Sequence, residues 1–135
     1  MNIYIEETKE FNSSEILEIY KLNKWSAFQK PELLIKGLKN SHCLIIASYD
    51  NKVVGLGNAI SDGHLVVYFP HLLIHPDYQG KGIGTLIIDK LKEKYNGFHQ
   101  QMLTADNDAI DFYTKKGFDK AGKTQSMWIY EGNDH

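Results

Sequence analysis

Apolar and polar residues recur along the chain with two periods, and the switches between them outline the expected elements. A period of two, typical of a half-buried strand, occurs at residues 2–7, and spacing of three to four, typical of an amphipathic helix, follows Asn12. Short runs between turn residues continue the alternation of element types. The pattern predicts strands at residues 2–7, 42–49, 52–60, 64–74, 100–104 and 126–130, with helices after Asn12, from Pro31 to Leu38, from the 79–84 segment to about Tyr95, and from Asp106 to Lys116.

The resulting order is β-α-α-β-β-β-α-β-α followed by a hairpin that begins at Phe118 and closes with residues 126–130. This order predicts one α/β (α+β) domain over residues 1–135 around a mixed sheet. Two predicted strands contain residues that disturb a regular ladder. Gly55 and Gly57 indicate a bulge or a close backbone approach, and Pro70 predicts a bulge, bend or splayed edge, because proline cannot donate to the ladder.

Composition and charge narrow the class of partner. The chain carries a formal net charge of -2, which argues against a nucleic-acid partner or an anionic membrane surface. No apolar stretch approaches the roughly 20 residues that span a bilayer, and the N-terminus lacks a signal-peptide pattern, so we expect a cytoplasmic protein. The single cysteine, Cys43, excludes an intrachain disulfide, and no histidine lies at ligand spacing from cysteine or carboxylate, so we expect no metal.

Three alternating glycines lie where a strand passes into a helix. The strand is Leu72-Leu73-Ile74, and the segment Gln79-Gly80-Lys81-Gly82-Ile83-Gly84 follows His75-Pro76. Glycines leave backbone N–H groups bare, and with a helix N-terminus they form a site for an anion such as pyrophosphate. The spacing matches neither the nucleoside-triphosphatase loop, because Gly82 follows Lys81, nor the dinucleotide fingerprint G-x-G-x-x-G.

This segment is similar to the acetyl-CoA loop of the GNAT-type N-acetyltransferase superfamily, Q/R-x-x-G-x-G/A after a strand that ends in an apolar residue, x and Pro. Residues 106–118 resemble the helix of that family that ends in F-Y-x-x-x-G-F, and the element order also matches. The resemblance implies a sheet splayed between the fourth strand (64–74) and the fifth (100–104), with helices on both faces. It implies an N-acetyltransferase that uses acetyl-CoA as co-substrate, without a metal.

The resemblance also implies roles for individual residues. Backbone groups of Leu72, Leu73 and Ile74 would bind the pantetheine arm as a surrogate strand. The backbone N–H groups that would hold the pyrophosphate are those of Gln79, Gly80, Lys81, Gly82, Ile83, Gly84 and Thr85. Tyr113 would be the general acid for the CoA thiolate, because a phenol with a pKa near 10 is protonated at neutral pH. The family often has asparagine where this chain has Asp106, which leaves the neighbouring Asn107 as a candidate CoA ligand.

The general base and the acceptor are less determined by the sequence. His71 stands where relatives often place an acidic base, Asp62 and His64 are alternatives, and water can also take the amine proton. The acceptor pocket would include Trp25, Phe28, Tyr68 and Phe69. The near-neutral chain favours a small-molecule amine over a protein acceptor. A CoA-binding module without catalysis and a different phosphate-ligand protein are the alternative functions, and residues 126–130 could pair within the chain or across a homodimer.

Overall fold

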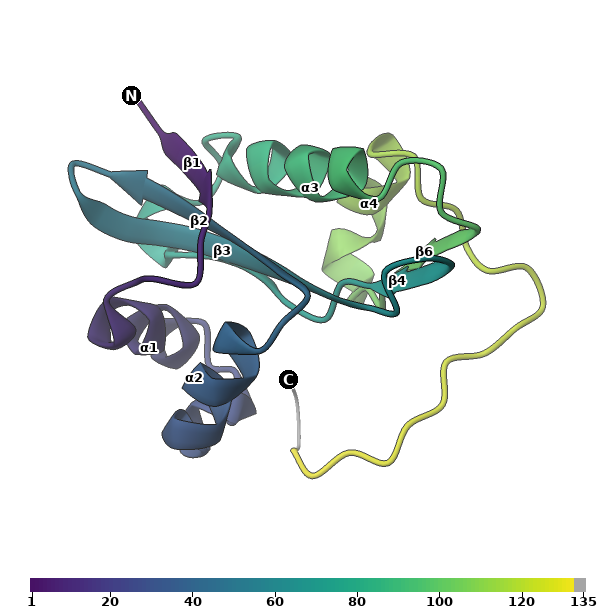
Figure 1. Cartoon of the computed structure of the whole chain (residues 1–135), viewed down its shortest axis with the longest axis horizontal. Coiled ribbons are helices and arrows are strands. Elements are labelled where there is room, and N and C mark those ends of the chain that lie inside the picture. Colours follow the sequence, from purple (N-terminus) through teal and green to yellow (C-terminus); the bar gives the residue numbers. More distant parts are fainter. Residues whose placement is uncertain (133–135) are drawn as a thin grey trace.

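A computed structural model describes residues 1–132 and shows a twisted sheet with helices on both faces. Helices α1 (Ser13–Leu22) and α2 (Pro31–Lys39) cover one face, and α3 (Ile83–Lys94) covers the other (Figure 1). The short helix α4 (Ile110–Lys115) lies beside α3. The remaining elements are the strands β1 (Tyr4–Glu7), β2 (Cys43–Tyr49), β3 (Lys52–Ser61), β4 (Val66–Tyr68), β5 (Leu72–Ile74) and β6 (Gln100–Met102), and the 3₁₀ turns η1 (Ser26–Gln29), η2 (Pro76–Tyr78) and η3 (Asn107–Ala109).

The sheet is mixed and it divides in the region of Pro70. The strand order is β1-β2-β3-β4-β6, antiparallel except for the parallel pair β4–β6, whereas β5 leaves this path and pairs with β3. The single strand expected over residues 64–74 is therefore two strands separated by residues 69–71. The last bond on the β6 side runs from Phe69 N–H to the Met102 carbonyl (3.0 Å), and beyond it β5 and β6 diverge. We call this opening between β5 and β6 the fork, and it confirms the expected splayed α/β fold.

Alternation along β2 divides the core into two layers. Cys43, Ile45 and Ala47 belong to the cluster under α3, and Leu44 and Ile46 belong to the cluster formed with α1 and α2. Successive side chains of a strand point to opposite faces, so an almost continuous apolar run is the pattern of a strand buried on both sides. The sheet is thereby fixed between the helical layers that carry the residues around the fork.

Both readings of the glycines in β3 are confirmed. A Cβ on Gly55 would lie 2.8 Å from Cδ1 of Ile74, so the glycine permits close approach of neighbouring elements. The ladder between β2 and β3 shifts register between Ala47 and Ser48, which pair with Gly55 and Val53. A bulge therefore lies next to the first glycine, and a glycine in the interior of a strand often marks such a position.

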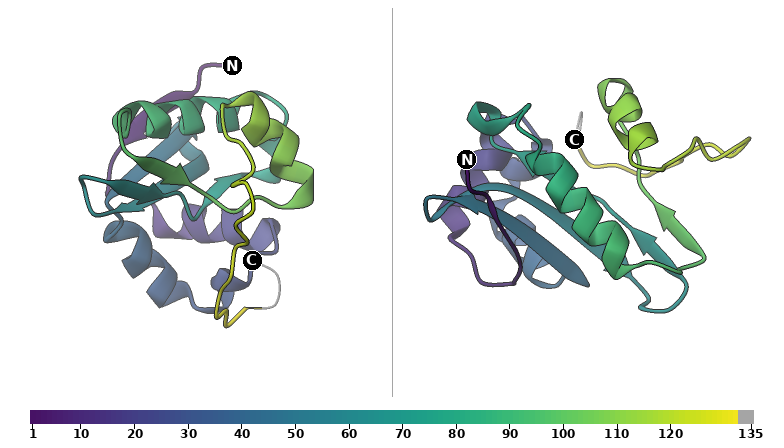
Figure 2. Two further views of the ribbon diagram at one scale, coloured as in Figure 1. Left: turned by 90° about the vertical axis from the view of Figure 1, so that its right-hand side faces the viewer. Right: turned by 90° about the horizontal axis from the view of Figure 1, so that it is seen from above.

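The prediction of a closing hairpin from Phe118 to residue 130 is wrong, because the structure has no strand after α4 within residues 1–132. The C-terminal arm, residues 119–132, joins no ladder; it loops out from the sheet (Figure 2) and returns to η1, where the hydroxyls of Tyr130 and Ser26 lie 3.0 Å apart. Gly122 has a φ of +64° and Thr124 N–H bonds back to the Ala121 carbonyl (3.1 Å), so a turn occupies the place of the first hairpin strand. Ile129 is 100% exposed, and within residues 1–132 no strand pairs with this segment. Through residue 132, no helix has both the length and the apolar character needed to cross a bilayer.

Candidate active site

The glycine segment forms an open backbone concavity at the N-terminus of α3. Gly80 and Gly82 have φ values of +76° and +85°, and a Cβ at either position would meet nothing within 4 Å. Gly82 is the N-cap and no side chain caps the helix. The first intrahelical bond runs from Leu86 N–H to the Gly82 carbonyl (3.2 Å), so the N–H groups of the three preceding residues lie ahead of the helical ladder. This arrangement suits a pyrophosphate, which is attracted by bare N–H groups and the helix dipole.

The sequence-predicted loop residues are brought together, although their side chains differ in environment. Ile83 is buried under the sheet with only 1% exposed, so its backbone alone is available to a ligand. Gly84 faces α4, since a Cβ there would lie 3.5 Å from Cζ of Phe112. Lys81 is exposed and adds a positive charge at the loop. The loop therefore lies beside the helix that carries Tyr113.

The fork leaves one edge of β5 without a neighbouring strand in the part of the chain that the structure describes. Leu73 pairs with Leu56, and the flanking bonds run from Asn58 N–H to the His71 carbonyl (3.1 Å) and from His75 N–H to the Val54 carbonyl (2.8 Å). Because bonded positions alternate in an antiparallel pair, the backbone groups of Leu72 and Ile74 face the fork. Two of the three predicted β5 residues thus present backbone groups to the opening, and Leu73 uses its own in the sheet.

The carbonyl of Ile74 already has partners, which the sequence did not indicate. Nδ2 of Asn23 donates to it at 3.0 Å and Nε2 of Gln79 donates to it at 3.1 Å. Gln79 Nε2 also lies 3.1 Å from the Asn23 side-chain oxygen. These bonds join the end of α1, the end of β5 and the start of the loop. The side chain of Gln79 therefore shapes the loop, and its backbone N–H, which the sequence assigned to the pyrophosphate, already donates to the Pro76 carbonyl at 3.4 Å.

Tyr113 lies on α4 and packs among aromatic side chains at the fork. Its ring contacts Phe118 edge to face (5.8 Å between centroids), and Phe118 in turn contacts Phe69 (6.3 Å) at the end of β4. Burial, together with the negative charge of Asp106, raises the pKa of Tyr113 to about 12. The phenol is accordingly protonated at neutral pH, as a proton donor must be.

His71 occupies the bend between β4 and β5 and is held by three neighbours. Its backbone N–H donates to Oδ1 of Asn58 (3.1 Å), and its ring nitrogen Nδ1 lies 2.6 Å from the hydroxyl of Tyr20. The imidazole ring also contacts Trp25, at 5.0 Å between centroids. Asn58 is 4% exposed and its amide also donates to Ser41 (2.9 Å). A polar asparagine inside an apolar strand was the available sequence signal for this network.

The remaining sequence candidates separate into structural and open positions. Oδ1 of Asp62 accepts from the N–H groups of residues 64, 65 and 66, and the bonds from Leu65 and then His64 hold the pKa of this carboxyl below its usual range. Such a carboxylate serves the turn and is a weak base. Phe69 is a core residue with 5% exposed, whereas Asn107 is exposed at the start of η3, and its ligand role stays a prediction.

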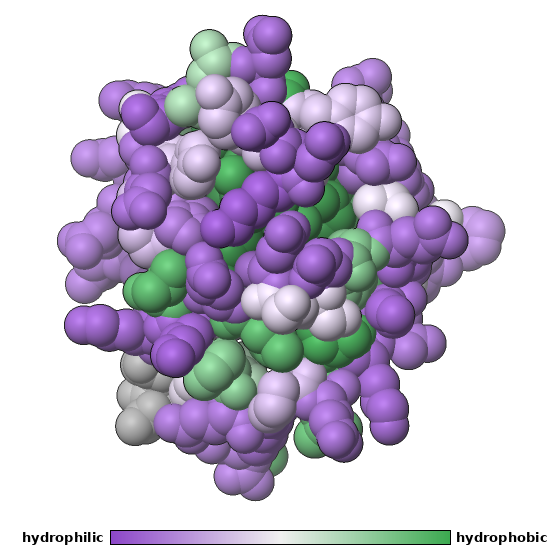
Figure 3. Space-filling view, turned by 90° about the vertical axis from the view of Figure 1, so that its left-hand side faces the viewer, coloured by the Kyte–Doolittle hydropathy of each residue, from purple (hydrophilic) through white to green (hydrophobic). Residues whose placement is uncertain are grey.

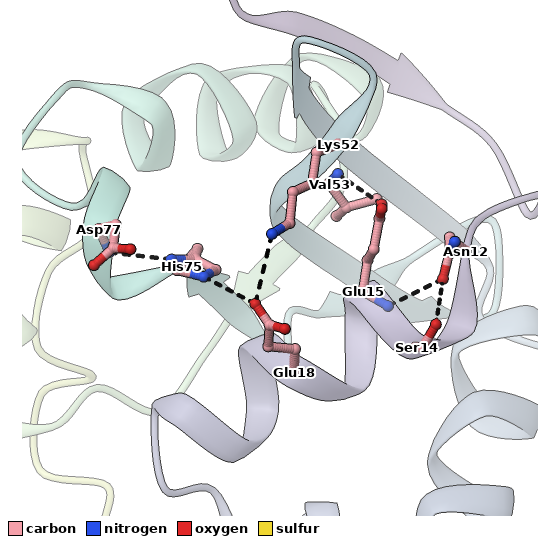
Figure 4. Close-up of polar contacts among 8 residues, drawn as sticks. All are labelled: Asn12, Ser14, Glu15, Glu18, Lys52, Val53, His75 and Asp77. Carbon is pink, nitrogen blue, oxygen red and sulfur yellow. Dashed lines mark hydrogen bonds and ion pairs between the residues drawn. The ribbon is translucent and has the colours of Figure 1, made fainter.

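An open hollow of about 610 Å³ lies between α1 and η2. At its edge, Nδ1 of buried His75 accepts from Asp77 N–H (3.1 Å), and Nε2 lies 3.2 Å from Oε1 of Glu18, which is 3.8 Å from Lys52 Nζ (Figure 4). The His75 contacts attach α1 to the turn that precedes the glycine loop.

The surface seen from the hairpin end of β2 and β3 is mainly polar. Polar side chains there surround recesses in which apolar side chains are visible (Figure 3).

Comparison with known proteins agrees with this geometry. The acetyltransferase (GNAT) domain model matches residues 7–128. An uncharacterized N-acetyltransferase, ycf52, of Pyropia yezoensis is 32% identical over 126 residues, which are 88% of this chain and 71% of that protein. A GNAT-family acetyltransferase structure from Streptococcus pneumoniae has a TM-score of 0.83 at 24% identity, covering 96% of this chain and 99% of the other.

A more distant solved structure shares the fold. The glucosamine-6-phosphate N-acetyltransferase of Arabidopsis thaliana has a TM-score of 0.70 at 13% identity, covering 97% of this chain and 99% of that one. The domain match spans the fork, the glycine loop and α4. On that match and the Pyropia relative, the chain belongs to the acetyltransferase (GNAT) domain family.

Proposed function

We propose that this protein transfers the acetyl group of acetyl-CoA to the primary amine of a small molecule. The observation that carries the proposal is the free edge of β5 next to the glycine loop. The backbone groups of Leu72 and Ile74 face the fork, and the bare N–H groups of Ile83 to Thr85 lie just beyond the end of the same strand. One extended ligand with an amide-containing arm and a pyrophosphate matches both sets of groups.

The loop would hold the charged part of the ligand mainly through its backbone. Gly80 and Gly82 face open space, so phosphate oxygens could approach their N–H groups without meeting a side chain. The edge of β5 would hold the arm by strand-like hydrogen bonds. The groups that would make them are the N–H groups of Leu72 and Ile74 and the carbonyl of Leu72, because the Ile74 carbonyl already accepts from the side-chain amides of Asn23 and Gln79. Acetyl-CoA supplies the activated acetyl group for the transfer.

Tyr113 is the proposed proton donor. The transfer forms a C–N bond between the acetyl carbon and the amine nitrogen and breaks the C–S bond; the amine loses one proton and the sulfur gains one. The protonated Tyr113 phenol on α4 would supply the sulfur's proton and recover it from solvent. Its packing against Phe118 fixes the ring beside the fork.

A small-molecule acceptor is supported by charge and by the surroundings of His71. The net charge of -2 is small, so the protein would attract a strongly basic protein tail only weakly. The rings of Trp25 and His71 lie 5.0 Å apart near the bend of the sheet, and aromatic rings there would suit a cationic or neutral amine. One protein that shares the fold, from Arabidopsis thaliana, is by its name a glucosamine-6-phosphate N-acetyltransferase, which is consistent with the proposed class of acceptor. The cytoplasmic location and the single-domain organisation expected from the sequence stay predictions.

Calorimetric titration of the purified protein with acetyl-CoA, CoA and ATP tests the proposal. We expect micromolar binding of both CoA species and none of ATP, followed by release of free thiol when amines are added. Failure of both CoA species to bind a folded protein would refute the ligand assignment. Binding without thiol release across a broad panel of amines would instead indicate a CoA-binding module.

A further inference from the structure

A buried tyrosine on α1 makes a short hydrogen bond to the histidine at the fork. The hydroxyl of Tyr20 lies 2.6 Å from Nδ1 of His71, and the Tyr20 side chain is 0% exposed. The rings also contact each other at 5.4 Å between centroids. Tyr20 comes from the helical layer, whereas His71 comes from the sheet, so the bond links two separate parts of the fold.

The direction of this bond follows from the needs of the buried hydroxyl. Burial raises the pKa of Tyr20 far above its usual range, so the phenol keeps its proton. Within residues 1–132, the acceptor that the structure gives this proton is Nδ1 of His71. If Nδ1 carried a proton, it would donate to the Tyr20 oxygen, and the hydroxyl would lose that acceptor, which is unfavourable for a buried group.

We propose that Tyr20 is a positioning residue that holds His71 as the tautomer with its proton on Nε2, so that His71 serves at the fork as a hydrogen-bond donor and not as a base. The proposal deepens the proposed acetyl transfer and rests on it. A neutral imidazole has one N–H and one acceptor nitrogen, and Tyr20 uses the acceptor. The base role expected from the sequence requires the opposite tautomer.

The donor suits the charge that develops during acyl transfer. The carbonyl oxygen of the acetyl group gains negative charge as the amine attacks, and a fixed donor at that oxygen lowers the barrier. His71 is fixed because Asn58 bonds its backbone on both sides, at 3.1 Å each, and Trp25 packs on its ring. In this assignment the amine gives its proton to water, and Nε2–H remains bonded to nitrogen throughout.

Nitrogen-15 NMR of the histidine side chains tests the tautomer directly, without acetyl-CoA and without activity. We expect the His71 proton on Nε2 in the wild type and a mixture of tautomers in Tyr20→Phe. Tyr95→Phe is the matched control, because the Tyr95 hydroxyl lies 2.6 Å from Nδ1 of His42 and Tyr95 is also buried. It should change His42 and leave His71 unchanged. A proton on Nδ1 of His71 in the wild type overturns the proposal, whether or not the variants fold.

Kinetics of two His71 variants separate a donor from a base. A glutamine amide offers an acceptor and a donor but cannot take a proton, so we expect His71→Gln to keep kcat within about tenfold of the wild type, and His71→Ala to lose about 10²- to 10³-fold. Equal, large losses in both folded variants would assign the base role and overturn the donor role. If no amine is acetylated by the wild type, the proposed function fails, and the NMR result still decides the tautomer.

Discussion

Gly57 of β3 and Ile87 of α3 approach so closely that a Cβ on the glycine would lie 2.6 Å from Cγ2 of the isoleucine. Cδ1 of Leu91 would be only 3.2 Å away. Helix α3 therefore rests directly on the backbone of β3. Because the N-terminus of this helix carries the glycine loop, the close approach also sets the position of the loop relative to β5.

Gly57→Ala should destabilise the protein by about 1–3 kcal/mol, because the added methyl group must displace Ile87 or the helix. Urea unfolding followed by circular dichroism measures the loss. Gly37→Ala in α2 is the matched control, since a Cβ at Gly37 meets nothing within 4 Å. That change should stabilise the helix by up to about 1 kcal/mol. An unchanged unfolding free energy for Gly57→Ala would contradict the packing described above.

The order of helices and strands was largely predictable because it depends on local periodicity. The amphipathic spacing after Asn12 and the apolar run from Cys43 both gave elements with nearly the expected bounds. Pro70 correctly indicated the break between β4 and β5, because its missing N–H acts locally. The final hairpin could not be predicted in this way, since a closing strand needs a partner, and the alternation of residues 126–130 does not show whether one is present.

Gly82→Ala should weaken binding of CoA at least about tenfold, because a methyl group would enter the concavity and the backbone would resist a φ of +85°. Titration calorimetry measures the affinity. The protein without ligand should lose only about 1–2 kcal/mol of stability, since the Cβ itself meets no atom. Gly97→Ala is the control: Gly97 has a φ of +89°, equally open surroundings and a place beyond the other end of α3. Equal affinities of both variants for CoA would remove Gly82 from the site.

Tyr113→Phe should lower kcat by about ten- to a thousandfold while the affinity for acetyl-CoA is nearly kept, because in the proposed mechanism the phenol protonates the leaving sulfur and does not hold the bound ligand. Steady-state thiol release and calorimetry give the two values. Tyr49→Phe controls for loss of a phenol from the same core cluster. A rate equal to that of the wild type would show that another group protonates the sulfur.

Stability above pH 10 should depend on Tyr113. Burial and then the charge of Asp106 raise its pKa from 10 to about 12, so the ionised form is disfavoured in the folded chain. The stability linked to the neutral phenol is present below pH 10 and is lost as the pH rises through 12. The midpoint temperature of thermal unfolding should therefore fall less steeply with pH across this range in Tyr113→Phe than in the wild type. Replacing the exposed Tyr4 with phenylalanine should leave the slope of midpoint against pH unchanged. Parallel curves for wild type and Tyr113→Phe would contradict the buried environment.

The candidate site was predictable where backbone chemistry defines it and not where distant side chains meet. The spacing of the three glycines after a strand was enough to predict the loop. By contrast, the bond from Asn23 to the Ile74 carbonyl joins residues 51 positions apart, and Tyr20 and His71 are separated by the same interval. Helical spacing identifies Tyr20 as a core residue, which it is, but spacing cannot show which nitrogen its hydroxyl meets.

Ile129→Asp should change the unfolding free energy by no more than about 0.5 kcal/mol, because the side chain is fully exposed on the C-terminal arm. Ile46→Asp, at a position with 4% exposed in β2, is the contrasting variant and should prevent stable folding, since it buries a charge. Thermal unfolding at several protein concentrations, with sedimentation analysis, gives the comparison. If Ile129→Asp lowered the midpoint substantially, the arm would pair in solution. Loss of a dimer at the same time would place that pairing between two copies, and an unchanged monomer would place it on the chain's own β6.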